Sequence, residues 1–292
     1  MPELPEVETI RLGLQKYLVG KKLSEVEVRL PKVIVGGDVG DLVDRVVEKV
    51  RRFGKVLVLD FSTGLSLMVH IKLTGQLIVQ VPRAAQVARV SREKVGTLPN
   101  RWTHLIFHFH DETKLFYNDL RQFGWIRVLP TKNVEHFKFI RELGPEPEIA
   151  TRNKLTCNKL TKEKFAELLK NKNTKIKPLL LDQTKISGVG NIYSNDALFL
   201  AKIDPRRPAK TLSNDEAVRL YNALLEVLKK SLDLGGSSEN TYVNALGEEG
   251  EYQKHMLVYA KAGKLCKNGC GNVIKRISLG GRGTFYCEKC QK

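Results

Sequence analysis

Near the start of the chain, apolar residues recur every three or four positions, which is the spacing of an amphipathic helix. The residues that follow this spacing are Val7, Ile10, Leu14 and Leu18. Pro5 suits the first turn of a helix, because the N–H group that it lacks would have no partner there. Gly20 follows the last apolar position, so we expect one helix to open the chain and to end near this glycine.

Beyond this helix the pattern changes to short apolar runs and to alternation, both typical of β-strands. Strand-like runs cover residues 26–30, 56–61, 65–73, 104–110 and 123–129. Several short strands without long helices between them predict an antiparallel β-sandwich. Residues 81–100 are polar and aperiodic, so we expect an exposed loop inside this sheet structure.

The second half of the chain favours helices, and a break rich in proline and glycine at residues 143–147 separates it from the strands. Ser213 and Glu216 have the spacing of a capping box, which marks a helix that ends before Gly235 and Gly236. Shorter helices are expected at residues 161–170, 176–181 and 191–201. The polar residues 235–263 would join these helices to the end of the chain.

Composition and charge narrow the class of protein. Apolar residues make up 42% of the 292 positions and charged residues 28%, which is globular rather than disordered composition. No apolar run is long enough to cross a bilayer, and the acidic first residues do not resemble a secretory signal, so we expect a cytoplasmic protein. The 49 basic and 32 acidic residues leave a net charge of +17, which favours nucleic acid as a partner over a membrane surface.

Four of the five cysteines lie in the last 27 residues, in two closely spaced pairs. The pairs are Cys266 with Cys270 and Cys287 with Cys290. Two thiolate pairs on two short turns are typical of a tetrahedral zinc site, whereas a disulfide framework would distribute its cysteines along the chain. Because four protein ligands would fill the site, we predict one structural zinc ion; four unrelated thiols are the alternative. Arg282, between the pairs, lies near glycines at an expected hairpin tip.

Two further features could carry chemistry. Pro2 follows the initiator methionine, whose removal would leave a secondary amine that can attack a sugar carbon, with Glu3 beside it as an acid. The plainer interpretation is that both residues only lead into the first helix. Residues 188–191 (GVGN) precede a helix and could receive a phosphate at its N-terminus, or could form an ordinary turn.

Seven short motifs stand in order along the chain: residues 1–9, Lys55 and residues 70–75, 119–124, 143–147, 188–193 and 284–287. Together they resemble the bacterial formamidopyrimidine-DNA glycosylases, which belong to a family that also includes endonuclease VIII. The resemblance implies removal of oxidised purines, 8-oxoguanine and formamidopyrimidines, from double-stranded damaged DNA, followed by strand cleavage through β,δ-elimination. It implies that Pro2 forms a Schiff base at C1′, Glu3 donates a proton, Lys55 assists β-elimination, and Arg282 assists δ-elimination and holds a phosphate.

The resemblance also assigns residues that hold the DNA. His70, Lys172 and Asn191 would contact the backbone, Arg121 would read the base opposite the lesion, and Phe123 and Leu73 would fill the space that the extruded base leaves. The plainer alternatives are solvated surface charge for Lys55, Arg121 and Lys172. For Phe123 and His70 the plainer alternative is a place in the core.

Three positions depart from the family pattern. Leu73 stands where methionine is usual, which leaves the wedge apolar but less adaptable. Gln122 replaces a second arginine and removes one possible phosphate contact. Trp102 stands in place of a histidine that contacts the backbone, so that role is not carried over.

We therefore predict an α+β chain of several domains. An antiparallel β-sandwich with flanking helices would cover residues 1–140, a linker 141–150, a helix-two-turn-helix domain 151–250 and a zinc-finger β-hairpin 251–292. The expected function is that of a bifunctional DNA glycosylase and AP lyase, associated with the bacterial nucleoid, acting as a monomer without a nucleotide cofactor. An endonuclease VIII-type enzyme for oxidised pyrimidines and a non-enzymatic zinc DNA-binding protein are the alternatives.

Overall fold

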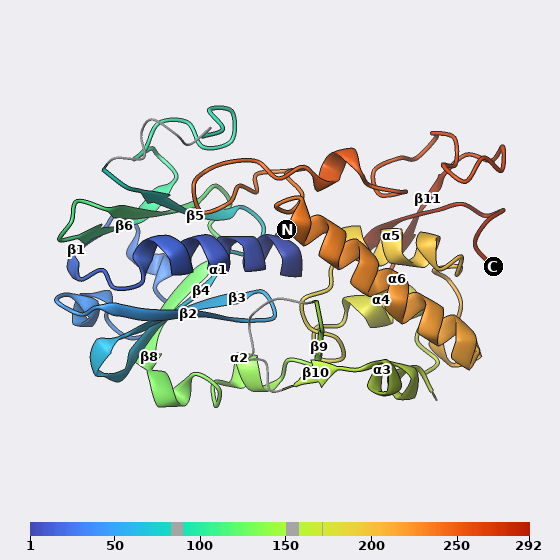
Figure 1. Ribbon diagram of the computed structural model, residues 1–292, viewed down its shortest axis with the longest axis horizontal. Helices are drawn as coiled ribbons and strands as arrows, with labels where there is room; N and C mark the ends of the chain where they lie inside the picture. Colours follow the sequence, from blue (N-terminus) through green and yellow to red (C-terminus); the bar gives the residue numbers. More distant parts are fainter. Residues whose placement is uncertain (83–89, 150–157, 171) are drawn as a thin grey trace. The chain divides into compact units, whose positions relative to one another are not determined.

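The computed structural model describes residues 1–82, 90–149, 158–170 and 172–292, and it divides the chain into two compact units. The N-terminal unit consists of Met1–Arg141 together with Leu232–Gln253 (Figure 1). The C-terminal unit consists of Glu142–Ser231 together with Lys254–Lys292. Within the described ranges, every helix is too short or too polar to cross a lipid bilayer.

The N-terminal unit contains two antiparallel four-stranded sheets, in the orders β1-β6-β7-β5 and β2-β3-β4-β8. The strands are β1 (Leu23–Val28), β2 (Val47–Phe53), β3 (Val56–Phe61), β4 (Leu65–His70), β5 (Gly75–Gln80), β6 (Thr103–Phe109), β7 (Lys114–Asp119) and β8 (Trp125–Pro130). Apolar side chains from both sheets, such as Leu59 and Phe107, belong to one buried core. The predicted antiparallel sandwich is therefore confirmed.

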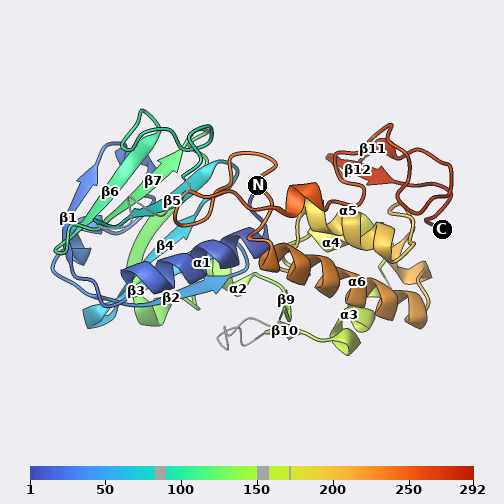
Figure 2. The ribbon, with the colours of Figure 1, turned by 45° about the horizontal axis from the view of Figure 1, so that its top comes forward.

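Helix α1 (Leu4–Leu18) runs along β2 (Figure 2), and a short helix α2 (Lys138–Arg141) ends this part of the chain. The four apolar positions that predicted α1 are all buried, with exposed fractions of 1% or less. Gly13 permits a close approach, because a β-carbon there would lie 2.5 Å from that of Ala245. The helix is therefore packed against the sheet and also against residues of the Leu232–Gln253 segment.

Three strands of the sandwich lie outside the predicted runs, and charge explains one of them. β2 contains Arg51 and Arg52, which are buried because they pair with Asp60 and Glu8. The run at 65–73 ends as a strand at His70, and the run at 123–129 begins as a strand at Trp125. Both differences leave predicted contact residues on turns between strands.

The C-terminal unit is mainly helical. It contains β9 (Glu146–Pro147), β10 (Lys159–Leu160), α3 (Lys162–Leu169), α4 (Ile176–Leu181), α5 (Asn191–Leu200) and α6 (Asn214–Asp233), followed by the hairpin of β11 (Lys275–Leu279) and β12 (Arg282–Tyr286). Ser213 and Glu216 form the predicted capping box, since each accepts a hydrogen bond from the backbone N–H of the other. The four predicted helices of this region are thus confirmed.

Two sequence expectations differ from the structure in the N-terminal unit. Residues 232–250, predicted as part of the central domain, group with the sandwich because Tyr242 and Ala245 are buried in its core. The predicted exposed loop at 81–100 is irregular, but Val95 is only 5% exposed and packs with Ile78 and Val243. Residues 83–89 of that loop lie outside the described residues.

Candidate functional site

The amino terminus of the N-terminal unit is held in a fixed conformation by the start of α1. Pro2 and Glu3 are buried, whereas Met1 is 40% exposed. Glu3 is the N-cap of α1 and forms a capping box with Glu6, whose Oε2 accepts a hydrogen bond from the Glu3 N–H at 2.7 Å. The capping box fixes the backbone that follows the predicted nucleophile.

The second carboxylate oxygen of Glu6 holds a segment from the far end of the unit. Glu6 Oε1 accepts a hydrogen bond from the Ser237 N–H at 2.8 Å. Gly236 has a φ of +88°, and a β-carbon there would lie 2.9 Å from the Tyr242 ring and 3.0 Å from Glu6 Cγ. Burial raises the pKa of Tyr242 well above its usual value, so its hydroxyl stays protonated and donates to the Gly235 carbonyl. Glu6 therefore joins Glu3 to residues 235–242.

A buried ion-pair network connects α1 with the β2–β3 turn that carries Lys55. Glu8 pairs with Arg11 and Arg52, both at 2.8 Å, and Arg52 also donates to the Gly54 carbonyl at 2.8 Å. Burial raises the pKa of Glu8, but the two guanidinium groups outweigh it and hold the carboxyl below its usual pKa. Lys55 follows Gly54 directly and is only 5% exposed. It is thus a buried residue, and the solvated-surface alternative for Lys55 is wrong.

His70 ends β4 and is 5% exposed between Trp125 and Phe139, whose ring centroids lie 5.7 and 5.6 Å away. Burial is the largest cause that lowers the pKa of His70, and with the positive charges of Lys72 and Lys55 it brings this pKa to about 3. Nδ1 accepts a hydrogen bond from the Lys72 N–H at 3.0 Å. The ring is therefore neutral with its proton on Nε2, which makes Nε2–H a hydrogen-bond donor.

Asp119 organises the turn between β7 and β8 that carries Arg121 and Phe123. Its carboxylate accepts hydrogen bonds from the backbone N–H of Arg121 at 3.2 Å and of Gly124 at 2.7 Å. The Arg121 guanidinium lies 4.7 Å from the centroid of the Phe123 ring, and Phe123 is 53% exposed. The core-aromatic alternative for Phe123 is therefore wrong.

Thr74 brings a second turn to the same place. Its hydroxyl donates to the Asp119 carboxylate, and its oxygen accepts from the Arg121 N–H at 2.9 Å. Leu73, the half-buried neighbour of Thr74, thus belongs to a turn that is tied to the turn of Arg121 and Phe123. The structure brings these three predicted residues together on adjoining turns.

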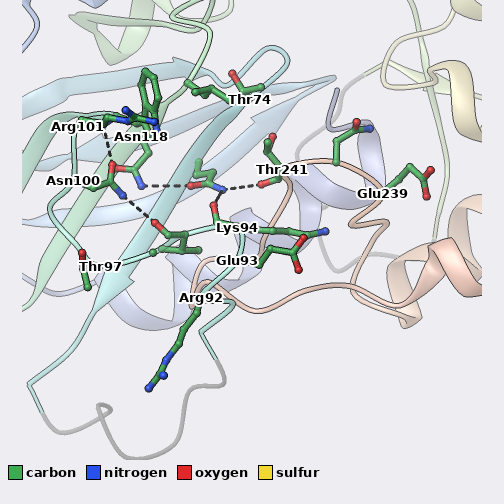
Figure 3. Close-up of a pocket in the computed structure, with 16 residues that line it drawn as sticks. Thr74, Arg92, Glu93, Lys94, Thr97, Asn100, Arg101, Asn118, Glu239 and Thr241 are labelled. Carbon is green, nitrogen blue, oxygen red and sulfur yellow. Dashed lines mark hydrogen bonds between the residues drawn. The ribbon is translucent and has the colours of Figure 1, made fainter.

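A pocket of about 750 Å³ opens beside these turns in the N-terminal unit (Figure 3). Its lining comes from three regions of the sequence, which are residues 74–76 with 118–120, residues 92–102, and residues 239–241. Gln76 and Asn118 are 5% and 3% exposed, and their side-chain amides are joined at 3.4 Å. Trp102, which replaces a histidine of the family pattern, lies in this lining. The sequence carried no local signal for this pocket, because its walls meet only in the fold.

The remaining predicted contact residues lie in the C-terminal unit. Arg282 is exposed at the start of β12, and the two-residue turn before it consists of Gly280 and Gly281 with φ values of +59° and +72°. These left-handed conformations at both turn positions favour glycine. Asn191 begins α5 after Gly190, and its amide donates to the Gly283 carbonyl at 3.2 Å. Lys172 is exposed in the turn after α3.

Lys177 also holds this hairpin, although it was not among the predicted contact residues. It is fully buried, and its ammonium donates to the Gly283 carbonyl at 2.8 Å and to the Thr284 hydroxyl at 2.7 Å. A lysine in a short helix has no sequence signal that separates such a role from surface charge. The residues next to Arg282 are thus fixed by α4 and α5.

The four paired cysteines form a compact cluster in which all sulfur atoms lie within 4.8 Å of one another. Cys266 and Cys290 are 3.7 Å apart, and Cys270 and Cys287 are 3.5 Å apart. Zinc–sulfur bonds of about 2.3 Å in a tetrahedron place sulfurs about 3.8 Å apart, so the cluster fits one zinc ion. With four thiolate ligands the ion has a structural role, as predicted.

Three family models match successive regions of the chain. A family model described as "Formamidopyrimidine-DNA glycosylase N-terminal domain" matches residues 1–126, and "Formamidopyrimidine-DNA glycosylase H2TH domain" matches residues 143–243. "Zinc finger found in FPG and IleRS" matches residues 263–292. Together these matches cover most of the chain.

Individual relatives match over the full length. The formamidopyrimidine-DNA glycosylase of Pelotomaculum thermopropionicum is 40% identical and aligns with 100% of this chain and 99% of its own. A Lactococcus lactis FPG mutant, solved in complex with DNA containing Fapy-dG, is 32% identical with a TM-score of 0.85 and full coverage of both chains. Another Lactococcus lactis Fpg structure, in complex with DNA containing an abasic site, is 32% identical with a TM-score of 0.84 and 99% coverage of both chains.

Proposed function

The chain belongs to the formamidopyrimidine-DNA glycosylase family, and from this premise we propose that its amino terminus excises the damaged base and then cleaves the strand. The chain is a DNA glycosylase of base excision repair. The AP lyase step and the residue roles below are our proposal. The observation that carries it is the buried Pro2–Glu3 terminus, which Glu6 fixes to α1 and to residues 235–242.

In the proposed reaction, removal of Met1 frees the nitrogen of Pro2. This nitrogen attacks C1′ of the damaged nucleotide, and the bond from C1′ to the base breaks. Glu3, next to the nucleophile, donates a proton to the sugar or to the leaving base. The nitrogen loses its own proton, and the C1′–O4′ bond of the sugar ring breaks as O4′ takes up a proton. The product is an iminium ion at C1′ that keeps its positive charge, because its nitrogen then carries no proton to lose, and the ion acts as an electron sink.

Strand cleavage then follows from the iminium ion. Removal of a proton from C2′, which Lys55 assists, expels the 3′ phosphate in β-elimination. Arg282 assists the second elimination, which expels the 5′ phosphate, and water finally hydrolyses the enzyme–sugar bond. Lys55 is suited to its part because it is buried close enough to His70 to influence the pKa of the imidazole. Arg282 is suited to its part because it is exposed on a rigid hairpin.

Damaged double-stranded DNA is the proposed substrate, and the Lactococcus lactis structures are complexes with DNA that contains Fapy-dG or an abasic site. A base must leave the duplex before attack, and Phe123 with Leu73 would fill the space, while Arg121 reads the opposite base. Neutral His70 would donate to a phosphate through Nε2–H, and Lys172 and Asn191 would contact the backbone. We propose residues 1–140, 151–250 and 251–292 as the functional domains of this enzyme, with residues 232–250 packed against the sandwich.

We assign the 750 Å³ pocket to the extruded base. Residues 239–241 of its wall follow directly after Ser237 and Ser238, and Glu6 holds the Ser237 N–H while it caps Glu3. Hydrogen bonds to Glu6 therefore connect the segment that forms this wall to the reactive terminus. Polar lining side chains such as Asn240 offer donors and acceptors to the edge of a base, and Trp102 offers an aromatic face.

Borohydride trapping tests the proposal. The wild-type chain and Pro2→Gly are incubated with two labelled duplexes, one with 8-oxoguanine opposite cytosine and one with an oxidised pyrimidine. We expect a covalent adduct on the purine lesion, none with Pro2→Gly, and duplex binding that persists in the variant. Trapping mainly on the pyrimidine lesion would support the endonuclease VIII alternative. Binding without trapping on either duplex would support the non-enzymatic alternative.

A further inference from the structure

Residues 91–96 do not form a free loop but pack against residues 243–249 of the same unit. The Ser91 N–H donates to the Gly247 carbonyl at 2.8 Å, and the Ser91 hydroxyl donates to Glu249 at 2.7 Å. Val95 adds apolar contact, since it is buried with Ile78 and Val243. We call residues 91–96 the brace.

Lys94 is the residue of the brace that reaches the pocket wall. Its ammonium donates to the carbonyl of Ser238 and lies 3.1 Å from the Glu249 carboxylate. The Lys94 side chain is only 14% exposed, although it carries a charge. The carbonyl that it holds belongs to the residue just before the three wall residues 239–241.

Gln76 holds the other end of the same wall. Its side-chain amide donates to the Thr241 carbonyl at 2.7 Å and to the Lys94 carbonyl at 3.1 Å (Figure 3). Gln76 lies on β5 and is joined through Asn118 to Thr103 on β6. The wall residues Glu239, Asn240 and Thr241 are thus fixed at one end by Lys94 and at the other by a polar chain across the sheet.

These contacts matter because residues 237–249 contain no helix or strand within the described chain. Outside helices and strands, a segment depends on individual contacts with other elements to hold its shape, and local opening is otherwise cheap. A pocket that separates a damaged base from a normal one must hold its donors and acceptors in place before the base arrives. The bonds of Lys94 and Gln76 contribute to that order, together with the Gln253 side chain, which accepts a hydrogen bond from the Ser238 N–H at 2.9 Å.

We propose that Lys94 is a positioning residue that fixes the wall at residues 238–241, and that this order determines how efficiently a damaged base is excised. The inference rests on the proposed function, in which the pocket receives the extruded base. Lys94 acts through the wall residues and takes no part in the bond changes at C1′. Cleavage of an abasic site, which has no base to hold, is therefore independent of Lys94.

The first test measures the wall directly, by amide hydrogen exchange followed by mass spectrometry. Lys94→Met is compared with Lys114→Met, a change of the same type at an exposed position of β7. We expect exchange at residues 238–242 to be at least about tenfold faster in Lys94→Met, unchanged in Lys114→Met and partly restored in Lys94→Arg. Unchanged exchange in Lys94→Met would show that Lys94 does not hold residues 238–241, and this conclusion would not depend on any activity measurement.

Glu249→Gln gives a second variant, in which Lys94 is present but its carboxylate partner is not. We expect a smaller acceleration of exchange in this variant.

The second test compares two substrates. Lys94→Met should release 8-oxoguanine about tenfold more slowly than wild type, while it cleaves a preformed abasic site within about twofold of wild type. An equal loss on both substrates would overturn the positioning role, because it would indicate general damage to the unit. If the wild-type chain acts on neither substrate, the proposed function fails, and the exchange measurement still decides whether Lys94 holds the wall.

Discussion

Glu3 caps the start of α1 and Arg282 begins β12, but different interactions hold these two residues in place. At the amino terminus, Glu6 accepts hydrogen bonds from Glu3 and from Ser237, a residue 231 positions away along the chain. At the hairpin, Arg282 follows a two-residue glycine turn, and the cysteine cluster lies within the same 30 residues. The first arrangement depends on one carboxylate that joins distant parts of the chain. The second combines a local turn and a metal ion with hydrogen bonds from Lys177 and Asn191.

Because of this difference, we expect that a substitution can destabilise one of the two regions and leave the other folded. The amino terminus depends on buried polar groups that must all find partners, because an unpaired buried N–H costs about 1–3 kcal/mol. The hairpin has a small apolar cluster of its own around Phe199, Val258 and Ile274, and the zinc ion adds most of its stability. Changes in one region are therefore expected to leave the other at wild type.

The largest effect is expected from removing zinc. Structural zinc contributes about 10–16 kcal/mol in zinc-finger peptides, so Cys287→Ala should unfold residues 263–292. We expect zinc content to fall and amide exchange to become fast in this region, while α1 and both sheets keep wild-type protection. Cys157→Ala changes the one cysteine that belongs to neither sequence pair and serves as control. A zinc-free chain with a protected β11–β12 hairpin would contradict the structural role.

A smaller effect, confined to the other region, is expected from Glu6→Leu. The substitution leaves the N–H groups of Glu3 and Ser237 without this carboxylate, at a cost of about 3 kcal/mol in the free energy of unfolding. Urea denaturation measures the loss, and Glu48→Leu on the exposed face of β2 is the matched control. Zinc content should stay at wild type. If Glu6→Leu lowers the free energy of unfolding no more than Glu48→Leu does, the hydrogen bonds that join Glu6 to the amino terminus and to residues 235–242 do not stabilise the fold.

The same contrast separates what the sequence could predict from what it could not. The helix at α1, the capping box at Ser213 and the zinc cysteines are local patterns, and all three were predicted correctly. The sequence did not predict strand β2, because arginines in a sequence usually indicate an exposed segment, whereas Arg52 is buried against Glu8. Gln76, Lys94 and Lys177 had no local signal, since each is defined by partners more than 15 positions away.

The resemblance to a family predicted more residues of the site than local sequence patterns could. It singled out Phe123, Arg121 and Leu73, which the structure brings onto two turns tied by Thr74 and Asp119. Physical reasoning on the residues alone favoured a core position for Phe123, because an aromatic residue before a strand is usually buried. The exposure of Phe123 follows from the later start of β8 at Trp125.

A pH-dependent loss of stability is expected from His70. Its pKa is lowered to about 3 in the folded chain, so below pH 6.5 the unfolded chain binds a proton that the folded chain does not. This contribution to stability is complete above pH 6.5 and is lost as the pH falls toward 3, by about 2 kcal/mol between pH 6.5 and 5. His70→Gln should flatten this part of the pH profile in urea denaturation, whereas the exposed His136→Gln should not. Parallel profiles for wild type and His70→Gln would show that His70 is not held neutral.

The smallest effect on stability is expected from Lys177→Met in the hairpin region. The ammonium makes two hydrogen bonds, but burying its charge is costly, so an apolar side chain of similar length should cost only about 1 kcal/mol. The functional effect should be larger than this figure suggests, because the Thr284 hydroxyl that Lys177 holds donates in turn to the Arg282 carbonyl. We expect the ratio of δ- to β-elimination products to fall severalfold, with zinc content and base release unchanged, and Lys162→Met on the exposed surface of α3 is the control. An unchanged product ratio would mean that the zinc ion and the glycine turn alone place Arg282, and the two regions would then differ even more than the contacts of Lys177 indicate.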